Sequence, residues 1–201
     1  MSYTEQYLAE VSSIAGSIDV PAIDGILERL IDVRDRGGRC FCVGVGGSAA
    51  NASHLVNDLR KIAGIEAYSP SDNVAELTAR VNDEGWEHVF SRWLAQSRIA
   101  ERDLLFVLSV GGGDLERGIS VNLVRAMEQA RTVSAAIVAI VGRAEGHAAR
   151  FADVAVVVPT VNPLTVTAHA EAFQSVVCHL LVSHPRLRRN EMRWESVTPG
   201  A

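Results

Sequence analysis

The stretch RCFCVGVGGSAANASHLVNDL, residues 39–59, decides the fold of this chain. It begins with an apolar run over 39–45 that is typical of a short buried strand, and it turns at Gly46-Gly47. Apolar residues then recur at helical spacing, which predicts a helix over 48–62. A strand that passes through a glycine turn into a helix is the start of a parallel α/β unit. The unpaired N–H groups of such a helix start favour an anion.

The same alternation continues to the end of the chain. Further strands are predicted at 65–69, 103–110, 135–142 and 153–159, and further helices at 4–15, 22–36, 72–81, 85–96, 120–131, 145–151 and 165–183. The sequence therefore predicts one α/β domain over residues 1–201, a doubly wound and mostly parallel five-stranded sheet flanked by helices. Residues 1–37 are predicted to form an N-terminal helical hairpin that serves oligomerisation.

Composition narrows the classes of function. Hydrophobic residues make up 48% and charged residues 21%, as in a globular protein, and the net charge of −5 argues against nucleic-acid binding. The most basic stretch, "RLRRN" at 186–190, is interpreted as a solvated tail. The N-terminus does not resemble a signal peptide, and no apolar stretch reaches about 18 residues, so we expect no membrane association and a cytoplasmic location. Cys40, Cys42 and Cys178 lie in apolar elements and are expected to be reduced core residues.

Two helices carry polar residues that suggest chemistry. His54 and Asp58 lie one turn apart and project from one helical face, although such a pair alone is usually an ordinary surface contact. On the last helix, Glu171 and His179 lie on nearly the same side, with Gln174 beside them. Polar groups in an apolar helix are expensive to bury without partners. They form either a structural hydrogen-bond network or, where the two helices meet, a site for a substrate or a metal.

Two loops mark a candidate ligand cleft. Residues 44–48 and 109–113 each follow a strand, and ligands bind at the carboxyl ends of strands in open parallel sheets. Each loop alone is equally well explained as a tight turn, but two together favour a cleft. Nucleotide binding is not favoured, because the first loop lacks both the full G-x-G-x-x-G spacing and the lysine of a P-loop.

"GGSAANASHLVNDL" (46–59) resembles the G-G-S-A-A-x-A-x-H-x-x-x-E-L motif of the phosphoheptose isomerases, the sedoheptulose 7-phosphate isomerases of the sugar isomerase (SIS) fold family. The similarity continues through "ELTARVNDEGWEHVFSRWL" (76–94), "LLFVLSVGGG" (104–113), "VAIVG" (138–142) and "EAFQSVVCHLL" (171–181). It spans nearly the whole chain, with the motifs in the expected order, and is more specific than any single loop.

The resemblance implies an aldose–ketose isomerase that acts on a sugar phosphate, sedoheptulose 7-phosphate to D-glycero-D-manno-heptose 7-phosphate, through an enediol. Family members are homotetramers with active sites between subunits, and some bind zinc. Carried over by position, the resemblance gives Asp58, His179 and Glu171 as catalytic residues, and His54, Asp58, Glu171 and His179 as ligands of a divalent metal. The candidate substrate-binding residues are Gly46, Gly47, Ser48, Asn82, Asp83, Ser109, Gly111, Gly112, Ser120 and Gln174. For Asn82 and Asp83 a role in forming a turn is an equal alternative.

This chemistry suits the residue types. Moving a proton between adjacent carbons needs a base that works near neutral pH and a second group for the oxygens. A divalent metal would polarise the carbonyl, and two histidines with two carboxylates are an acceptable set of ligands for zinc.

Three departures from the family pattern bear on function. Asp58 stands for a glutamate, and Glu171 stands for a glutamine, so the two changes are hypothesised to compensate each other. The family's S-T-S-G is replaced by Ser-Val-Gly-Gly at 109–112, with an apparent insertion before Ser120 and a new Arg117. The alternative function is a non-catalytic protein that binds a sugar phosphate as a regulator or serves as a protein-interaction adaptor.

Overall fold

A computed structural model describes residues 1–192, so the last part of the domain predicted over 1–201 lies outside the described residues. Five strands form its only sheet within that range. They are β1 (Arg39–Val43), β2 (Glu66–Tyr68), β3 (Leu104–Ser109), β4 (Ala136–Val141) and β5 (Val154–Val157). All neighbouring strands are parallel, in the order β2-β1-β3-β4-β5. The predicted five-stranded, doubly wound parallel sheet is confirmed.

Helices connect the strands as the sequence predicts. They are α1 (Tyr3–Ser17), α2 (Val20–Asp35), α3 (Gly47–Asp58), α4 (Val74–Glu84), α5 (Val89–Gln96), α6 (Val121–Thr132), α7 (His147–Phe151) and α8 (Val166–Ser183), with a π-helical turn η1 (Leu59–Ala63) after α3 and a 3-10 turn η2 (Pro70–Asp72). Among the described residues, none of these helices is both long enough and apolar enough to cross a bilayer.

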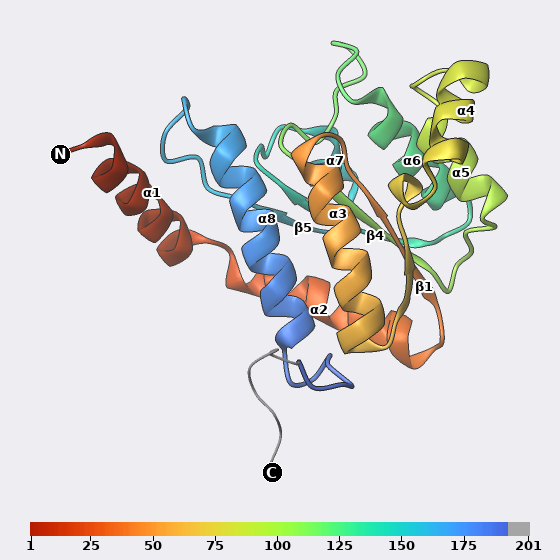
Figure 1. The fold of residues 1–201 in the computed structure, drawn as a ribbon, viewed down its shortest axis with the longest axis horizontal. Coiled ribbons are helices and arrows are strands. Elements are labelled where there is room, and N and C mark those ends of the chain that lie inside the picture. The colour runs from red at the N-terminus through yellow and green to blue at the C-terminus, as the bar shows by residue number, and fades with distance from the viewer. Residues whose placement is uncertain (193–201) are drawn as a thin grey trace.

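The helices cover both faces of the sheet. Alternate residues of β1 point to opposite faces. Cys40 and Cys42 belong to a core cluster with α2, α3 and α8, whereas Phe41 and Val43 belong to a second cluster with α5, α6 and α7. Figure 1 shows α3 and α8 side by side in front of the sheet. The three cysteines are buried and form no disulfide, as expected of reduced core residues.

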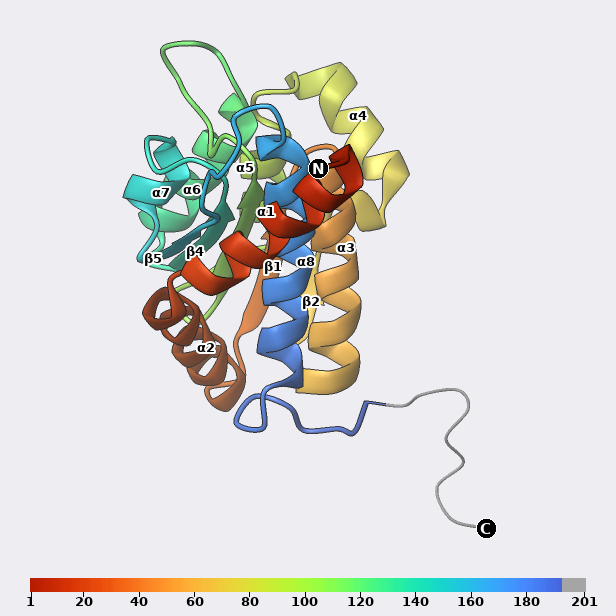
Figure 2. The same cartoon turned by 90° about the vertical axis from the view of Figure 1, so that its left-hand side faces the viewer.

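The two N-terminal helices are present, and α1 projects from the body of the molecule. Figure 1 shows α1 reaching outward from the start of α2, and Figure 2 shows it passing in front of α8. Ile14 is its only fully buried residue. A polar contact ties α1 to α8, because the Oε2 atom of Glu10 lies 2.8 Å from the Nε2 atom of His169. Most of the surface of α1 is therefore left exposed in the single chain.

Residues 186–192, called here the C-terminal segment, fold back beneath α3 and α8. Leu187 is fully buried, and Arg34 donates hydrogen bonds to the carbonyl oxygens of Arg186 and Leu187 at 2.8 and 2.6 Å. The side chain of Asn190 donates to the carbonyl oxygen of Lys61. The interpretation of 186–190 as a solvated tail holds for the exposed side chains of four of its five residues. It is wrong for Leu187, which is buried, and the backbone of the segment is bonded to the domain.

Candidate active site

Glycines set the direction in which α3 leaves the sheet. Gly46 has φ of +64°, a left-handed conformation that strains any other residue. At Gly44 a Cβ atom would lie 2.6 Å from the carbonyl carbon of Ser48, which is closer than real Cβ contacts. The chain therefore turns within a few residues of the end of β1, and α3 runs back across the sheet next to α8.

A hydrogen-bond network then fixes how α3 sits against α8. The amide nitrogen of Asn51 donates to Gln174 Oε1 at 2.9 Å, and Gln174 Nε2 donates to the hydroxyl of Ser48 at 3.1 Å. Ser175 donates to the amide oxygen of Asn51 at 2.8 Å. The contacts advance along both helices in the same direction, so the two helices run parallel, and residues one or two turns further on must also meet.

At that point three functional side chains converge. The Nε2 atom of His54 lies 3.3 Å from Asp58 Oδ2 and 3.3 Å from the Nε2 atom of His179. His179 Nε2 is also 3.7 Å from the same carboxylate oxygen. The two rings meet edge to face, with centroids 4.9 Å apart. The expected convergence of the two helices on a polar cluster is thus present for these three residues.

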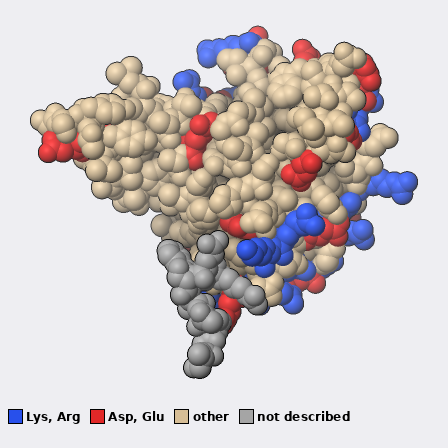
Figure 3. Space-filling view, viewed as in Figure 1, with Lys and Arg blue, Asp and Glu red and all other residues tan. Residues whose placement is uncertain are grey.

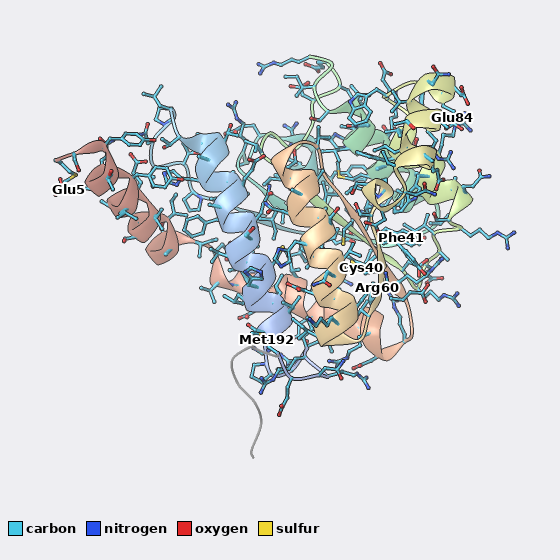
Figure 4. All side chains as sticks on the ribbon, viewed as in Figure 1. Glu5, Cys40, Phe41, Arg60, Glu84 and Met192 are labelled. Carbon is cyan, nitrogen blue, oxygen red and sulfur yellow. The ribbon has the colours of Figure 1, made fainter. Side chains whose placement is uncertain are left out.

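The cluster opens into a cavity of about 390 Å³. The side chains of His54 and His179 are 57% and 56% exposed there, whereas that of Asp58 is only 11% exposed. Asn57 donates to Asp58 Oδ1 at 2.9 Å, which leaves Oδ2 turned toward the imidazoles. Figure 4 shows Met192, another lining residue, at the foot of α8. The cavity therefore has a fixed carboxylate at its base and two accessible imidazoles at its side.

The donor set suits a divalent metal. One ligand atom from each of the three side chains can be chosen so that all three lie within 4.8 Å of one another. Two imidazole nitrogens and one carboxylate oxygen are a ligand set that zinc uses at catalytic sites, where a fourth position is left for water or substrate. The residues present therefore fit such an ion.

Comparison with known proteins identifies the family of the chain. The SIS domain family matches residues 6–142. A phosphoheptose isomerase of Chlorobaculum parvum is 30% identical over 89% of this chain and 81% of its own length. One of Mycobacterium tuberculosis is 36% identical over 69% of this chain and 70% of its own length. The structure of phosphoheptose isomerase from Neisseria gonorrhoeae superposes with a TM-score of 0.78 at 25% identity, covering 89% of this chain and 95% of that chain.

The chain belongs to the SIS domain family. Its relatives place it with the isomerase enzymes of that family. The family match includes α3 but ends before α8, so the pairing of His179 with His54 and Asp58 rests on the structure.

In this SIS domain Glu171 lies apart from the other proposed metal ligands, which corrects the four-residue set expected from the sequence. Eight residues of helix place it about 12 Å from His179 along α8. Its carboxylate instead lies against Gly47 at the start of α3, where a Cβ atom would come within 2.6 Å of its Cδ atom. A negative charge is favourable beside a helix N-terminus. Glu171 therefore occupies the very position at which the glycine turn was expected to attract an anion.

Two predicted substrate-binding residues of the SIS domain lie inside the helix contact. Gln174 is fully buried, and both ends of its amide are bonded, one to Asn51 and the other to Ser48. Ser48 is 1% exposed. Ser48 and Gln174 therefore form a structural hydrogen-bond network, one of the two alternatives given by the sequence. The network holds α3 and α8 in the register that brings His54 next to His179.

The loop after β3 borders a different cavity, of about 520 Å³. Gly111 lines it together with Arg117 and Arg143. Ser109 accepts a hydrogen bond from the backbone N–H of Gly112 at 3.0 Å. Asp114 and Ile119 bridge the apparent insertion, and Ser120 follows with φ of +47° just before α6. None of the residues that line this cavity lines the histidine cavity.

Asn82 and Asp83 lie near the end of α4 and are exposed. Asn82 donates to the carboxylate of Asp83 at 2.7 Å, and the helix ends at Gly85 with φ of +81°. Neither residue lines the histidine cavity. Gly46 and Gly47 are exposed at the turn before α3, on the opposite end of that helix from the cluster.

Sequence reasoning missed two charged residues of the histidine cavity, Lys61 and Glu191. A signal for Lys61 was present, because positions 54, 58 and 61 follow the i, i+4, i+7 spacing of one helical face. No signal existed for Glu191, which reaches the cavity only because the C-terminal segment docks on the domain.

Proposed function

We propose that this protein interconverts sedoheptulose 7-phosphate and D-glycero-D-manno-heptose 7-phosphate by proton transfer through an enediol. The observation that carries the proposal is the convergence of His54, Asp58 and His179 at one cavity. The two curated relatives and the Neisseria gonorrhoeae structure described above are named phosphoheptose isomerases, which supports a heptose phosphate as the substrate. A cavity of about 390 Å³ is within the range that binds small molecules.

The proposed reaction assigns a role to each side chain. Asp58 is the only carboxylate of the cluster, and it removes the proton from the carbon next to the carbonyl. The electron pair of that C–H bond forms the enediol double bond, while the carbonyl oxygen takes up a proton from the imidazole of His179. The hydroxyl on the carbon that lost its proton then gives its O–H proton back to His179 and becomes the new carbonyl, while Asp58 returns a proton to the former carbonyl carbon. The low exposure of Asp58 and its bond from Asn57 hold the base in one orientation.

We further propose that His54, Asp58 and His179 hold a divalent metal, with zinc as the ion. Such an ion, when bound, would polarise the substrate carbonyl and stabilise negative charge on its oxygen, in place of the proton that His179 gives in the metal-free reaction. Glu171 is not part of this proposed set, because its carboxylate lies at the start of α3.

The proposed reaction is tested by incubating the protein with sedoheptulose 7-phosphate in D₂O and following the sugar by NMR. We expect formation of the aldose and appearance of solvent deuterium at the exchanged carbon. Asp58→Asn is expected to lower kcat by about 10²- to 10⁴-fold, as loss of a general base does. The control is Asp32→Asn, an exposed carboxylate paired with Arg36 on α2.

Each outcome of that experiment separates the alternatives. Turnover with deuterium uptake that depends on Asp58 supports the isomerase. Binding of the sugar phosphate without turnover or deuterium uptake would instead favour a non-catalytic regulator or adaptor and would overturn the proposed reaction.

We propose that the protein assembles as a homotetramer through the face formed by α1, α8 and α3. Figure 3 shows that this face carries few charged side chains, whereas blue and red atoms gather at its right and lower margins. Leu8, Val176 and Leu180 are 61%, 52% and 43% exposed there. His54 on α3 and His179 on α8 are half-exposed. An assembly through these helices would therefore place the active site between subunits. Light scattering coupled to size exclusion tests it, and a monomeric mass would contradict it.

A further inference from the structure

The chain after α8 turns back toward the end of α3. Pro185 follows the last helical turn, and its ring and missing N–H prevent the helix from continuing. Leu187 is then fully buried, and Arg189 pairs with Asp35 on α2 at 3.4 Å. Figure 2 shows the C-terminal segment passing below the end of α3. The segment is therefore docked on α2 and lies beside the helix that carries Asp58.

The C-terminal segment caps the end of α3. The π-helical turn η1 continues α3 directly after Asp58, and the carbonyl groups of a last helical turn have no partner within the helix. The side chain of Asn190 donates to the carbonyl oxygen of Lys61 at 2.9 Å. The backbone N–H groups of Arg189 and Asn190 both donate to the carbonyl oxygen of Ile62, at 2.9 and 3.0 Å. Three hydrogen bonds thus join this helix end to a segment that is distant in the chain.

The segment also forms one side of the histidine cavity. The other lining residues belong to α3 with η1 and to α8, whereas Glu191 and Met192 belong to the segment. Because the bonds at Asn190 directly precede these two residues, docking of the segment fixes where they lie. The cavity of about 390 Å³ is near the small end of the range of ligand pockets, about 300–1,000 Å³. One side chain of its wall therefore changes the space that is left for a ligand.

We infer that the C-terminal segment is a wall of the active site, in which Asn190 positions the segment and Met192 limits the length of the sugar phosphate that the site accepts. This inference rests on the proposed function for the identity of the substrate, but not for the docking of the segment. Whichever end of the sugar lies at the histidine cavity, each additional carbon of the chain needs more room. The thioether of Met192 forms only weak hydrogen bonds, so the side chain acts by occupying space.

Selectivity for chain length tests the role of Met192. The measurement is kcat/KM for fructose 6-phosphate, sedoheptulose 7-phosphate and an octulose 8-phosphate. Met192→Ala is expected to raise the ratio of the eight-carbon to the seven-carbon kcat/KM by about 10-fold, the lower end of what one methylene group is worth in a pocket, and Met192→Trp is expected to lower it. Val74→Ala, which shortens an exposed apolar side chain on α4, is the matched control. An unchanged ratio in both Met192 variants would overturn the inference.

Hydrogen exchange tests the role of Asn190 without any turnover. The N–H groups of Arg189 and Asn190 are bonded to Ile62 only while the segment is docked, so their exchange reports docking. Asn190→Asp keeps the shape of the side chain but removes its donor. We expect these two amides to exchange about 2- to 10-fold faster, relative to unstructured peptides of the same sequence, which is the effect of losing one hydrogen bond.

Two further variants frame this measurement. Asn190→Gln retains an amide donor and should restore part of the protection. Gln96→Glu makes the same change from amide to carboxylate at the exposed end of α5 and should leave the exchange unchanged. If exchange in Asn190→Asp equals that of the wild type, the side chain of Asn190 does not hold the segment and its proposed role is wrong.

The kinetics of Asn190→Asp separate a positioning role from a merely structural one. Undocking removes the wall, so this variant should change the chain-length ratio in the same direction as Met192→Ala. A structural role alone would lower the melting temperature and leave that ratio unchanged. The latter result would contradict the inference.

The outcomes distinguish this inference from the proposed function. If the wild type turns over sedoheptulose 7-phosphate but no variant of Met192 or Asn190 changes the chain-length ratio, the isomerase stands and the wall is wrong. If the wild type turns over none of the three sugars, the proposed reaction is wrong. The wall is then tested by acylation of His54 and His179 with diethyl pyrocarbonate. Faster acylation of both in Asn190→Asp, with that of the exposed His88 unchanged, supports the wall, and equal rates overturn it.

Discussion

The Nε2 atoms of His54 and His179 lie 3.3 Å apart, although 125 residues separate them in the chain. For two imidazole nitrogens to share a hydrogen bond, one must carry the hydrogen and the other must be an unprotonated acceptor. Asp58 Oδ2 lies on the same side of both rings, at 3.3 and 3.7 Å. These three side chains face one another at a cavity, and each has an electron pair to donate. They are therefore well placed to bind one cation between them.

The first prediction concerns that cation. After chelation and dialysis, titration with zinc followed by calorimetry is expected to show one site per chain. His54→Ala, His179→Ala and Asp58→Asn each remove a ligand, so each should weaken binding by more than the roughly 10- to 100-fold that losing an outer hydrogen-bond partner costs. The control is His88→Ala, an exposed histidine at the start of α5. Unchanged zinc binding in all three ligand variants would show that the ion binds elsewhere.

The second prediction uses the position of Glu171. Its carboxylate lies against Gly47 and about 12 Å from His179 along α8, which exceeds a Debye length of about 8 Å in physiological salt. Glu171→Gln should therefore change the dissociation constant of zinc by less than about threefold in the same titration. A loss of zinc binding comparable to that in Asp58→Asn would show that Glu171 reaches the ion. That result would restore the four-residue set expected from the sequence.

The order and type of the elements could be predicted from the sequence because the patterns are local. β3 is buried at every position, and its continuous apolar sequence identifies it as a strand without knowledge of its neighbours in the sheet. The turn at Gly46 could be identified because only glycine adopts its backbone conformation without strain. His54 and Asp58 share a face by helical spacing alone, and the structure keeps them 3.3 Å apart.

What could not be predicted depends on contacts between distant segments. Glu171 and His179 do lie on one side of α8, but spacing along a helix does not say which turn of α3 each will meet. That register is set by the hydrogen bonds of Asn51 and Gln174. The docking of residues 186–190 depends on the burial of Leu187. This burial could not be predicted, because the arginines on both sides of Leu187 make the segment appear polar.

The third prediction tests the network that sets this register. Gln174→Ala would leave the buried hydroxyl of Ser48 without its side-chain partner, and it would remove one of the two acceptors of Asn51 Nδ2, which also donates to the carbonyl oxygen of Glu171. Each buried polar group that loses its partner costs about 1–3 kcal/mol, so we expect the free energy of unfolding to fall by at least that amount. Denaturant unfolding measures it. Gln96→Ala, at the exposed end of α5, is the matched control and should stay within about 0.5 kcal/mol of the wild type.

The fourth prediction concerns how α1 is attached. Hydrogen bonds from His169, then Asn162 and Gln6, lower the pKa of Glu10 from 4.5 to about 2. Because the pKa is lower in the folded state, the ionised carboxylate stabilises the docked helix above about pH 4.5, and this contribution is lost as the pH falls from there toward 2. The ring of His169 also packs on Tyr7, with centroids 4.4 Å apart, so the same contact orients α1.

Hydrogen exchange of the α1 amides measures this attachment. At pH 7, Glu10→Gln should exchange faster than the wild type over residues 3–17, and the difference should shrink as the pH approaches 2, where the wild-type carboxyl is itself protonated. Glu116→Gln, in the loop before α6, provides a control with the same change of charge. If the variant and the wild type differ equally at every pH, the charge of Glu10 does not hold the helix. The contact would then depend on packing against Tyr7 and Ile14.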